Sequence, residues 1–258
     1  MTVGVAFELR TTWALMRRAI NEIARVPAAV IPAVLAPTIF MCGLAAVFGN
    51  LTQLPGFTTD EYLTFILPVG FMQGAAFTGA ATGVNLARDI ELGWFDRLLV
   101  SPAPRGVLLA GTVLSASLRV LMPIALLMIV GLSLGVDFPG VDGLLIALLI
   151  ASCFAAIAAC YGVTLALKFK TQAAAPLMQA GVFMAVLFTT AYAPQELLTG
   201  WLADVAEYNP VTLILESVRQ GFVGEVTWAD TWPGLLALAG IGVLMVALAM
   251  RGLRRSSA

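Results

Sequence analysis

Residues 88–105 have the sequence RDIELGWFDRLLVSPAPR, a charged, tryptophan-containing stretch between two long apolar runs. The run before it, 63–87, and the run after it, 107–134, are each long enough to cross the hydrocarbon core of a bilayer, which takes about 20 helical residues. A simple connection between two spans does not need acidic and basic residues at helical spacing followed by Ser-Pro-x-Pro-Arg. We therefore interpret 88–105 as a surface that contacts another molecule.

The composition is typical of a chain that crosses the membrane several times. Of its 258 residues, 60% are hydrophobic and 11% are charged, and the mean hydropathy is +0.95. Soluble domains are about 45–50% apolar and about 25% charged. The net charge of −1 and the lack of a basic tract give no reason to expect a nucleic-acid partner. The expected fold is an all-α membrane protein that forms a single domain over residues 1–258.

Six apolar runs are candidate transmembrane helices. They cover approximately residues 26–48, 63–87, 107–134, 141–167, 173–193 and 232–250. Prolines occur within several of them, which membrane helices tolerate better than soluble helices do. An even number of spans places both termini on the same side of the membrane.

The basic residues predict the orientation. Twelve of the fourteen lie in four segments that six spans bring to one side: the N-terminal arm, 88–105, the 168–172 connection and the C-terminal tail. The connections on the opposite side contain only Arg219, together with most of the acidic residues. By the positive-inside rule, both termini and 88–105 are expected in the cytoplasm.

The first 25 residues predict an amphipathic helix on the cytoplasmic surface. Leu9, Trp13, Met16 and Ile20 recur at helical spacing on one face, and arginines occupy another. Such a helix lies in the headgroup layer with its apolar face toward the lipid. The charged region extends to Arg25, too far for the start of a cleavable signal peptide, so we expect no cleavage.

A second short helix is predicted in the connection before the last span. Asn209-Pro210 is typical of a helix start, with the amide as N-cap and proline in the first turn, and Gly224 favours a stop. The segment is too short and too polar to cross, so we expect it to dip into the outer leaflet or to cap the membrane core. Glu216 and Arg219 are three positions apart and are expected to pair.

The chain lacks the motifs of catalysis and of nucleotide binding. It has no histidine, the commonest general base and metal ligand, and no G-x-x-x-x-G-K-[ST], C-x-x-C or G-x-S-x-G. Within the spans, away from their ends, Arg119 is the only charged residue, so an ion relay is not expected. Cys42, Cys153 and Cys160 lie in apolar runs without metal-ligand spacing and are interpreted as small buried side chains. We expect no enzyme, no bound metal and no cofactor held by this chain.

With these features, the chain resembles the membrane subunit of ABC-2 type exporters, and among them the daunorubicin-resistance-type permeases of actinobacteria. The first motif that carries the resemblance is Arg88-Asp89-x-Glu91-x-Gly93-x-x-Asp96-Arg97-Leu98-Leu99-x-Ser101-Pro102-x-x-Arg105. The second is Leu198-x-x-Trp201-Leu202, followed by Asn209-Pro210-Val211-Thr212, Arg219 and Gly224. The resemblance covers essentially the whole chain.

The resemblance implies a multi-pass protein of the bacterial plasma (inner) membrane that works in a larger complex. Two six-span permeases, identical or paralogous, would join two copies of a separate ABC ATPase subunit, which binds the ATP and Mg. The segment after the second span would be a coupling helix in a groove of the ATPase, its contact residues being Asp89, Glu91, Gly93, Trp94, Phe95, Asp96, Arg97, Ser101, Pro102 and Arg105. Carboxylates suit a basic groove, and the two rings offer an apolar anchor. The alternative is an ordinary amphipathic helix resting on the headgroups.

The resemblance also implies a transport path between the paired permeases, lined mainly by the first, second and fifth spans. The candidate path residues are Thr78, Thr82, Asn85, Arg119, Gln179, Phe183 and Thr189. The first three share a helical face, and core packing with satisfied hydroxyls is an equal alternative. In the same span, Gly70-x-x-x-Gly74 and Gly79-x-x-x-Gly83 predict close approach of a neighbouring backbone.

Arg119 is the most costly residue of the predicted spans. It lies about a dozen residues into the third span, roughly 18 Å along the helix axis. The expected partners are Asn85, Gln179, helix carbonyls, the second subunit or an anionic substrate. Its role is open between a structural hydrogen-bond anchor, a substrate contact and a side chain that snorkels to the interface.

We expect an exporter permease subunit that moves an amphipathic drug, natural product or lipid outward, powered by a separate ATPase subunit. One alternative is a permease of the same fold that carries a polysaccharide or another large glycolipid. The other is a channel or secondary transporter that works without ATP.

Overall fold

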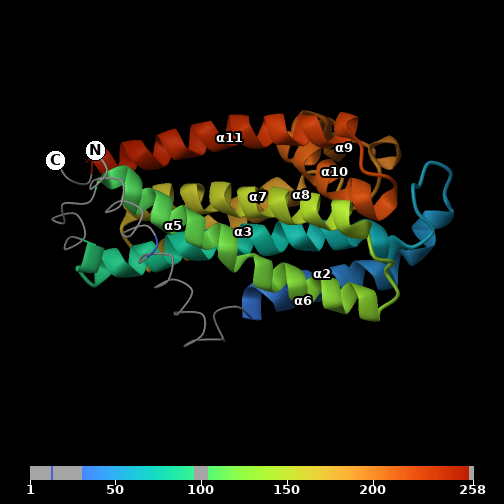
Figure 1. Cartoon of the computed structure of the whole chain (residues 1–258), viewed down its shortest axis with the longest axis horizontal. Helices are drawn as coiled ribbons and strands as arrows, with labels where there is room; N and C mark the ends of the chain where they lie inside the picture. Colours follow the sequence, from blue (N-terminus) through green and yellow to red (C-terminus); the bar gives the residue numbers. More distant parts are fainter. Residues whose placement is uncertain (1–12, 14–30, 96–103, 256–258) are drawn as a thin grey trace.

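The long helices run side by side along one axis of the molecule (Figure 1). The computed structural model describes residue 13, residues 31–95 and residues 104–255. Every regular element within these residues is helical, as the sequence predicts. The longer helices are α2 (Ile31–Phe48), α3 (Tyr62–Glu91), α5 (Arg105–Arg119), α6 (Leu121–Ser133), α7 (Gly140–Phe169) and α11 (Trp228–Arg255). The shorter ones are η2 (Gly49–Gln53), η3 (Gln172–Ala174), α8 (Ala175–Leu187), η4 (Gln195–Leu197), α9 (Trp201–Tyr208) and α10 (Pro210–Val223).

In the described part of the chain, five helical segments are long and apolar enough to cross a membrane. They correspond to the first four predicted spans and the last one. The fifth predicted span, 173–193, forms only the 13-residue α8, and the chain leaves the helix at Phe188. The physical reason is a capping contact: the side-chain nitrogen of Asn209 donates to the carbonyls of Ala185 (2.9 Å) and Phe188 (2.7 Å), which a longer helix would use itself.

The third predicted span consists of two helices, α5 and α6, that meet at Val120. Pro123 lies one turn later and has no N–H to donate to the carbonyl of Arg119, so the regular ladder is interrupted there. Val120 keeps right-handed helical angles, and α5 and α6 together still form a 29-residue apolar segment.

Helix α3 is the centre of the bundle. It packs against α2, α6, α7, α8 and α10, and 89% of its most apolar window is buried. The corresponding windows of α2 and α11 are only 11% and 17% buried, although both are strongly apolar. Surfaces of this kind are stable only against lipid or another apolar partner, which agrees with a multi-pass membrane protein.

The second of the two glycine pairs in α3 makes the predicted close approach. A Cβ atom built on Gly83 would lie 2.4 Å from the backbone of Gly162 in α7, and one on Gly79 would lie 2.4 Å from the side chain of Ala158. The first pair is less close. A Cβ atom on Gly74 would lie 3.4 Å from the backbone carbonyl of Ala33 in α2, whereas one on Gly70 would meet only the Leu127 side chain, at 3.8 Å, so no neighbouring backbone approaches Gly70.

The two ends of the bundle differ in charge. Helices α3, α7 and α11 end at one side of the molecule and α5 begins there (Figure 1). We call it the basic end, because its described residues include Arg88, Arg105, Lys168, Lys170, Arg251, Arg254 and Arg255. The opposite side, which carries α9 and α10, is the acidic end (Figure 1). Most of the predicted amphipathic helix in 1–25 lies outside the described residues, and Trp13 is exposed.

Candidate functional site

The first part of the predicted coupling segment belongs to the end of α3. The helix continues to Glu91, so Arg88 and Asp89 lie on its last turns rather than in a loop. The chain then turns at Gly93, whose φ of 68° is readily adopted by glycine. Arg105 is exposed and begins α5. The remaining predicted contact residues, Asp96, Arg97, Ser101 and Pro102, lie outside the described residues.

Glu91 joins the end of α3 to the connection between α7 and α8. One carboxylate oxygen accepts hydrogen bonds from the hydroxyl of Thr171 (2.7 Å) and the backbone N–H of Gln172 (2.9 Å). The other accepts from the side-chain amide of Gln172 (2.6 Å). The Thr171 oxygen also caps η3 by accepting from the N–H of Ala173 (3.2 Å). The carboxylate therefore already has partners within its own chain.

The apolar surface beside this contact differs from the predicted one. Phe95 is only 5% exposed and packs in a cluster with Leu109, Val163 and Leu253, so its ring is an interior side chain of this chain. Trp94 is half-buried. Leu92 occupies a position that is not specified in the motif. Its side chain is 70% exposed and forms the apolar surface that was predicted for Phe95.

Arg119 reaches α3 through Thr82. Its guanidinium donates to the Thr82 hydroxyl, which in turn donates to the carbonyl of Thr78 (3.2 Å). Three of the predicted path residues thus form one connected contact near the break between α5 and α6. Thr82 is not among the partners predicted for Arg119, but it lies one helical turn from the predicted Asn85.

The other predicted path residues lie apart from this contact. Asn85 is half-buried, and Gln179 is exposed on α8. Thr189 is buried and donates to a carbonyl in the last turn of α8 (2.6 Å). Phe183 stacks on Phe77 of α3 with ring centroids 5.4 Å apart. Of these four side chains, Phe183 thus packs α8 on α3.

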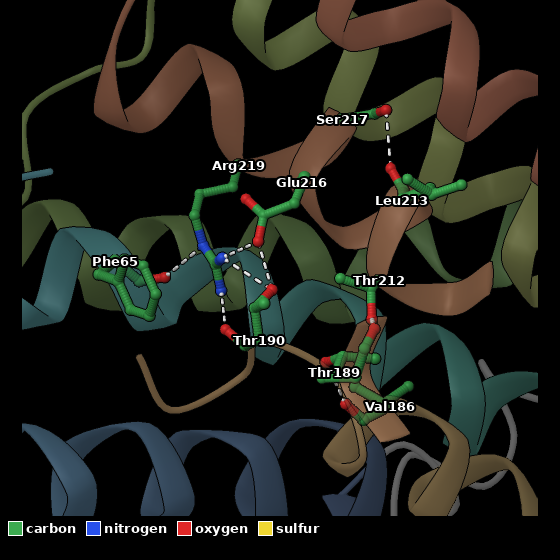
Figure 2. A network of polar contacts seen from close by, with 10 residues as sticks. Phe65, Val186, Thr189, Thr190, Thr212, Leu213, Glu216, Ser217 and Arg219 are labelled. Carbon is green, nitrogen blue, oxygen red and sulfur yellow. Dashed lines mark hydrogen bonds and ion pairs between the residues drawn. The ribbon is translucent and has the colours of Figure 1, made fainter. Parts of the chain in front are cut away.

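Arg219 is the centre of a polar network that Figure 2 shows from close by. Its helix, α10, lies at the acidic end (Figure 1). Its Nη1 donates to the carboxylate of Glu216 at 2.6 Å, so the predicted pair is confirmed. Nη2 donates to the carbonyl of Thr190 (2.8 Å), and Nε donates to the carbonyl of Phe65 (3.2 Å). The Thr190 hydroxyl donates to the same Glu216 oxygen. The guanidinium also lies over the Phe65 ring, 3.8 Å from its centroid.

The network places a charge in the interior of the bundle. Arg219 is 2% exposed, whereas the side chain of Glu216 is 45% exposed. Burial lowers the pKa of Arg219 from its ordinary value, and the nearby Glu216 carboxylate opposes that change. An arginine remains protonated under these conditions, so the site keeps a buried positive charge with four oxygen acceptors: the Glu216 carboxylate, the Thr190 hydroxyl and the carbonyls of Thr190 and Phe65.

Helix α10 has the predicted bounds but a more buried position than expected. The side chain of Asn209 accepts from the N–H of Val211 (3.0 Å), and the helix ends at Val223 before Gly224. Ser217 is fully buried and donates to the carbonyl of Asp230 (2.7 Å), which ties α10 to the start of α11. Helix α10 thus packs among α3, α7 and α11 rather than lying over them as a surface cap.

Two polar residues stand out only in three dimensions. From the sequence, Arg219 is expected on the polar side of a short helix, paired with Glu216. Its position four residues after Leu215, which belongs to the apolar stripe, is the one hint of burial. Gln73 in α3 is fully buried, and within the described residues neither its amide nitrogen nor its amide oxygen has a hydrogen-bond partner. A polar residue between Gly70 and Gly74 in an apolar run is the signal that could have drawn attention to it. Groups of three or more histidine, cysteine or acidic side chains able to hold a metal do not occur in the described ranges.

Known proteins of similar sequence are transport permeases. The daunorubicin resistance ABC transporter permease protein DrrB1 of Streptomyces coeruleorubidus is 28% identical over 253 residues, covering 93% of this chain and 85% of that protein. The probable doxorubicin resistance ABC transporter permease protein DrrC of Mycobacterium tuberculosis is 28% identical over 236 residues, covering 88% and 82%. The putative transport permease ycf38 of Cyanophora paradoxa is 24% identical over 216 residues, covering 83% and 74%.

A family model matches most of the described helices as well. The model for the ABC-2 type transporter matches residues 10–223, which include the segment around Glu91 and the Arg219 network. Its match extends over far more than half of the chain. The chain belongs to the ABC-2 type transporter family.

Proposed function

We propose that this chain is the membrane-spanning permease subunit of an ATP-binding-cassette exporter that moves an amphipathic drug, natural product or lipid outward. The observation that carries the proposal is the family match over residues 10–223. The names of two relatives, which are daunorubicin and doxorubicin resistance permeases, favour an amphipathic substrate.

We propose six crossings with both termini in the cytoplasm of a bacterial cell. The basic end would face the cytoplasm, because the positive-inside rule applies to short connections like those found there. The fifth crossing would combine α8, about 20 Å long at 1.5 Å per residue, with the non-helical residues 188–193.

The hydrogen bonds around 188–193 support such a crossing. Non-helical backbone is tolerated at membrane depth only where protein groups satisfy its carbonyls. Asn209 donates to the carbonyl of Phe188 (2.7 Å), Arg219 to that of Thr190 (2.8 Å) and the Tyr62 hydroxyl to that of Tyr192 (2.8 Å). Side chains from α3 and α10 thus replace the bonds that a longer α8 would form.

The chain would take its energy from a separate ABC ATPase subunit, since its sequence has no P-loop. In this proposal the complex holds two ATPase subunits, which bind ATP and Mg, and a second permease, identical or paralogous. The ATPase would contact the segment that follows Glu91, where Leu92 is exposed and Trp94 is half-buried. The candidate path residues Thr78, Thr82 and Arg119 would face the substrate where α3 meets α5.

Coexpression with an ABC ATPase subunit encoded beside this chain tests the proposal. Stable copurification, and ATP-dependent movement of doxorubicin into inverted vesicles, are the expected results. Asp96→Lys should abolish ATP-dependent movement while leaving membrane insertion intact, because it reverses a charge in the proposed contact. Doxorubicin flux through the chain alone in liposomes, without ATP, would instead identify a channel or secondary transporter.

A further inference from the structure

Helix α8 is held at both ends by side chains from other elements. At the basic end, the Glu91 carboxylate of α3 binds Thr171 and Gln172, directly before η3 and α8. At the acidic end, Asn209 binds the last carbonyls of α8, and Arg219 binds the carbonyl of Thr190 just beyond it.

Between these attachments α8 is short. It has 13 residues, with a proline in its first turn, and its one glycine is Gly181. Gly181 itself lies against the Tyr161 hydroxyl of α7, so a larger residue would not fit there. A displacement at one end of such a helix is therefore transmitted along its axis rather than absorbed within it.

We infer that Glu91 is a positioning residue: it fixes the segment that leads into α8 to the end of α3, and α8 acts as a strut between the end of α3 and the Arg219 network. Movement at the end of α3 would then reach α10 at the opposite end of the bundle. The inference goes beyond the proposed function, in which Glu91 is one of several carboxylates offered to an ATPase. It rests on that function only for the origin of the movement.

The geometry separates this role from a purely electrostatic one. The contact consists of three hydrogen bonds to one carboxylate, and no basic side chain takes part in those bonds. In Glu91→Gln, the amide oxygen can still accept from Thr171 and from the backbone of Gln172, and the side-chain amide of Gln172 can rotate to accept. The glutamine variant should therefore keep the strut attached, whereas Glu91→Ala should release it.

Amide hydrogen exchange of the full-length chain in lipid nanodiscs tests the inference. Without Glu91, the start of α8 loses its attachment, so in Glu91→Ala and Thr171→Val we expect exchange across 172–190 to rise by about fivefold or more. Glu91→Gln should stay within about twofold of the unmodified chain, because one acceptor oxygen suffices for most of the contact. Thr52→Val is the control for Thr171→Val. Thr52 is also a half-buried threonine, and its hydroxyl donates a hydrogen bond to the carbonyl of Gly49 (3.1 Å) within η2, away from α8.

Three results would overturn the inference. The first is unchanged exchange in Glu91→Ala, and the second is a change limited to residues 171–174, which would make the contact a local loop cap. The third is a glutamine variant that behaves like the alanine variant, which would assign the effect to charge. The exchange measurement needs no ATPase. It therefore tests the strut separately from the copurification and transport assays, which test the proposed ATPase contact.

Discussion

At the scale of single residues, Arg219 shows how this fold accommodates a charge inside an apolar bundle. Its guanidinium has a carboxylate, a hydroxyl, two backbone carbonyls and an aromatic face as partners. They belong to Phe65 of α3, Thr190 after α8 and Glu216 of α10 itself. A buried charge without such partners costs several kcal/mol, and the planar fork of arginine suits several acceptors at once. Arg219 therefore stabilises the junction of α3, α10 and the segment after α8.

Replacing Arg219 should destabilise the protein strongly. Arg219→Leu leaves the carbonyls of Phe65 and Thr190 buried without donors, and we expect the free energy of unfolding to fall by about 3 kcal/mol. The measurement is unfolding in mixed micelles with increasing SDS, followed by tryptophan fluorescence. Arg255→Leu makes the same substitution at an exposed position at the end of α11 and should change the free energy by less than about 0.5 kcal/mol. Equal effects of the two variants would contradict the role of the network.

At the scale of elements, the packing of α3 on α7 depends on the absence of side chains. Gly79 and Gly83 of α3 lie against Ala158 and Gly162 of α7, so the backbones approach directly. Without a hydrophobic driving force between helices in lipid, such close van der Waals contact is what holds membrane helices together. This interface is the most extensive one in the described bundle.

A methyl group at Gly83 should force α3 and α7 apart. In Gly83→Ala the new Cβ would lie 2.4 Å from the carbonyl carbon of Gly162, and backbone cannot give way as a flexible side chain can. We expect a loss of about 2 kcal/mol of stability, measured by the same SDS unfolding. Gly240→Ala is the control: that glycine lies within α11 with open space around it, and alanine there should be neutral or stabilising by up to about 1 kcal/mol. A tolerated Gly83→Ala would show that the two helices can separate at little cost.

At the scale of the whole molecule, the described charges separate toward the two ends of the bundle. Except for Arg119 and Arg219, the basic residues in the described ranges gather at the basic end. In the proposed arrangement of six crossings, this whole end lies on the cytoplasmic side of the membrane.

Labelling of single cysteines should reveal this arrangement. In a chain with Cys42, Cys153 and Cys160 replaced by alanine, Glu207→Cys at the acidic end should react with an impermeant maleimide in intact cells. Arg255→Cys at the basic end should react only after the membrane is permeabilised, because the proposed orientation places this end in the cytoplasm. Labelling of both positions from the same side would contradict six crossings.

Features that depend on near neighbours in the chain could be predicted from the sequence. The apolar runs predict the long helices because a helix satisfies its own backbone in lipid, whatever surrounds it. The bounds of α10 follow from Asn209 and Gly224, and the pair of Glu216 and Arg219 follows from their spacing on one helix. These contacts span fewer than sixteen residues, so local geometry suffices to set them.

Features that join distant segments were decided by the tertiary structure. The sequence predicts neither the burial of Phe95 nor Thr82 as the partner of Arg119, since each depends on which helix lies opposite. It predicts a full fifth span, yet α8 ends at Leu187, because Asn209 takes its last carbonyls. The residue pattern alone predicts an all-helical membrane protein with a distinctive segment at 88–105. Only tertiary packing decided that Glu91 of this segment binds the start of α8, because a hydrogen bond over 80 residues exists only once the helices have assembled.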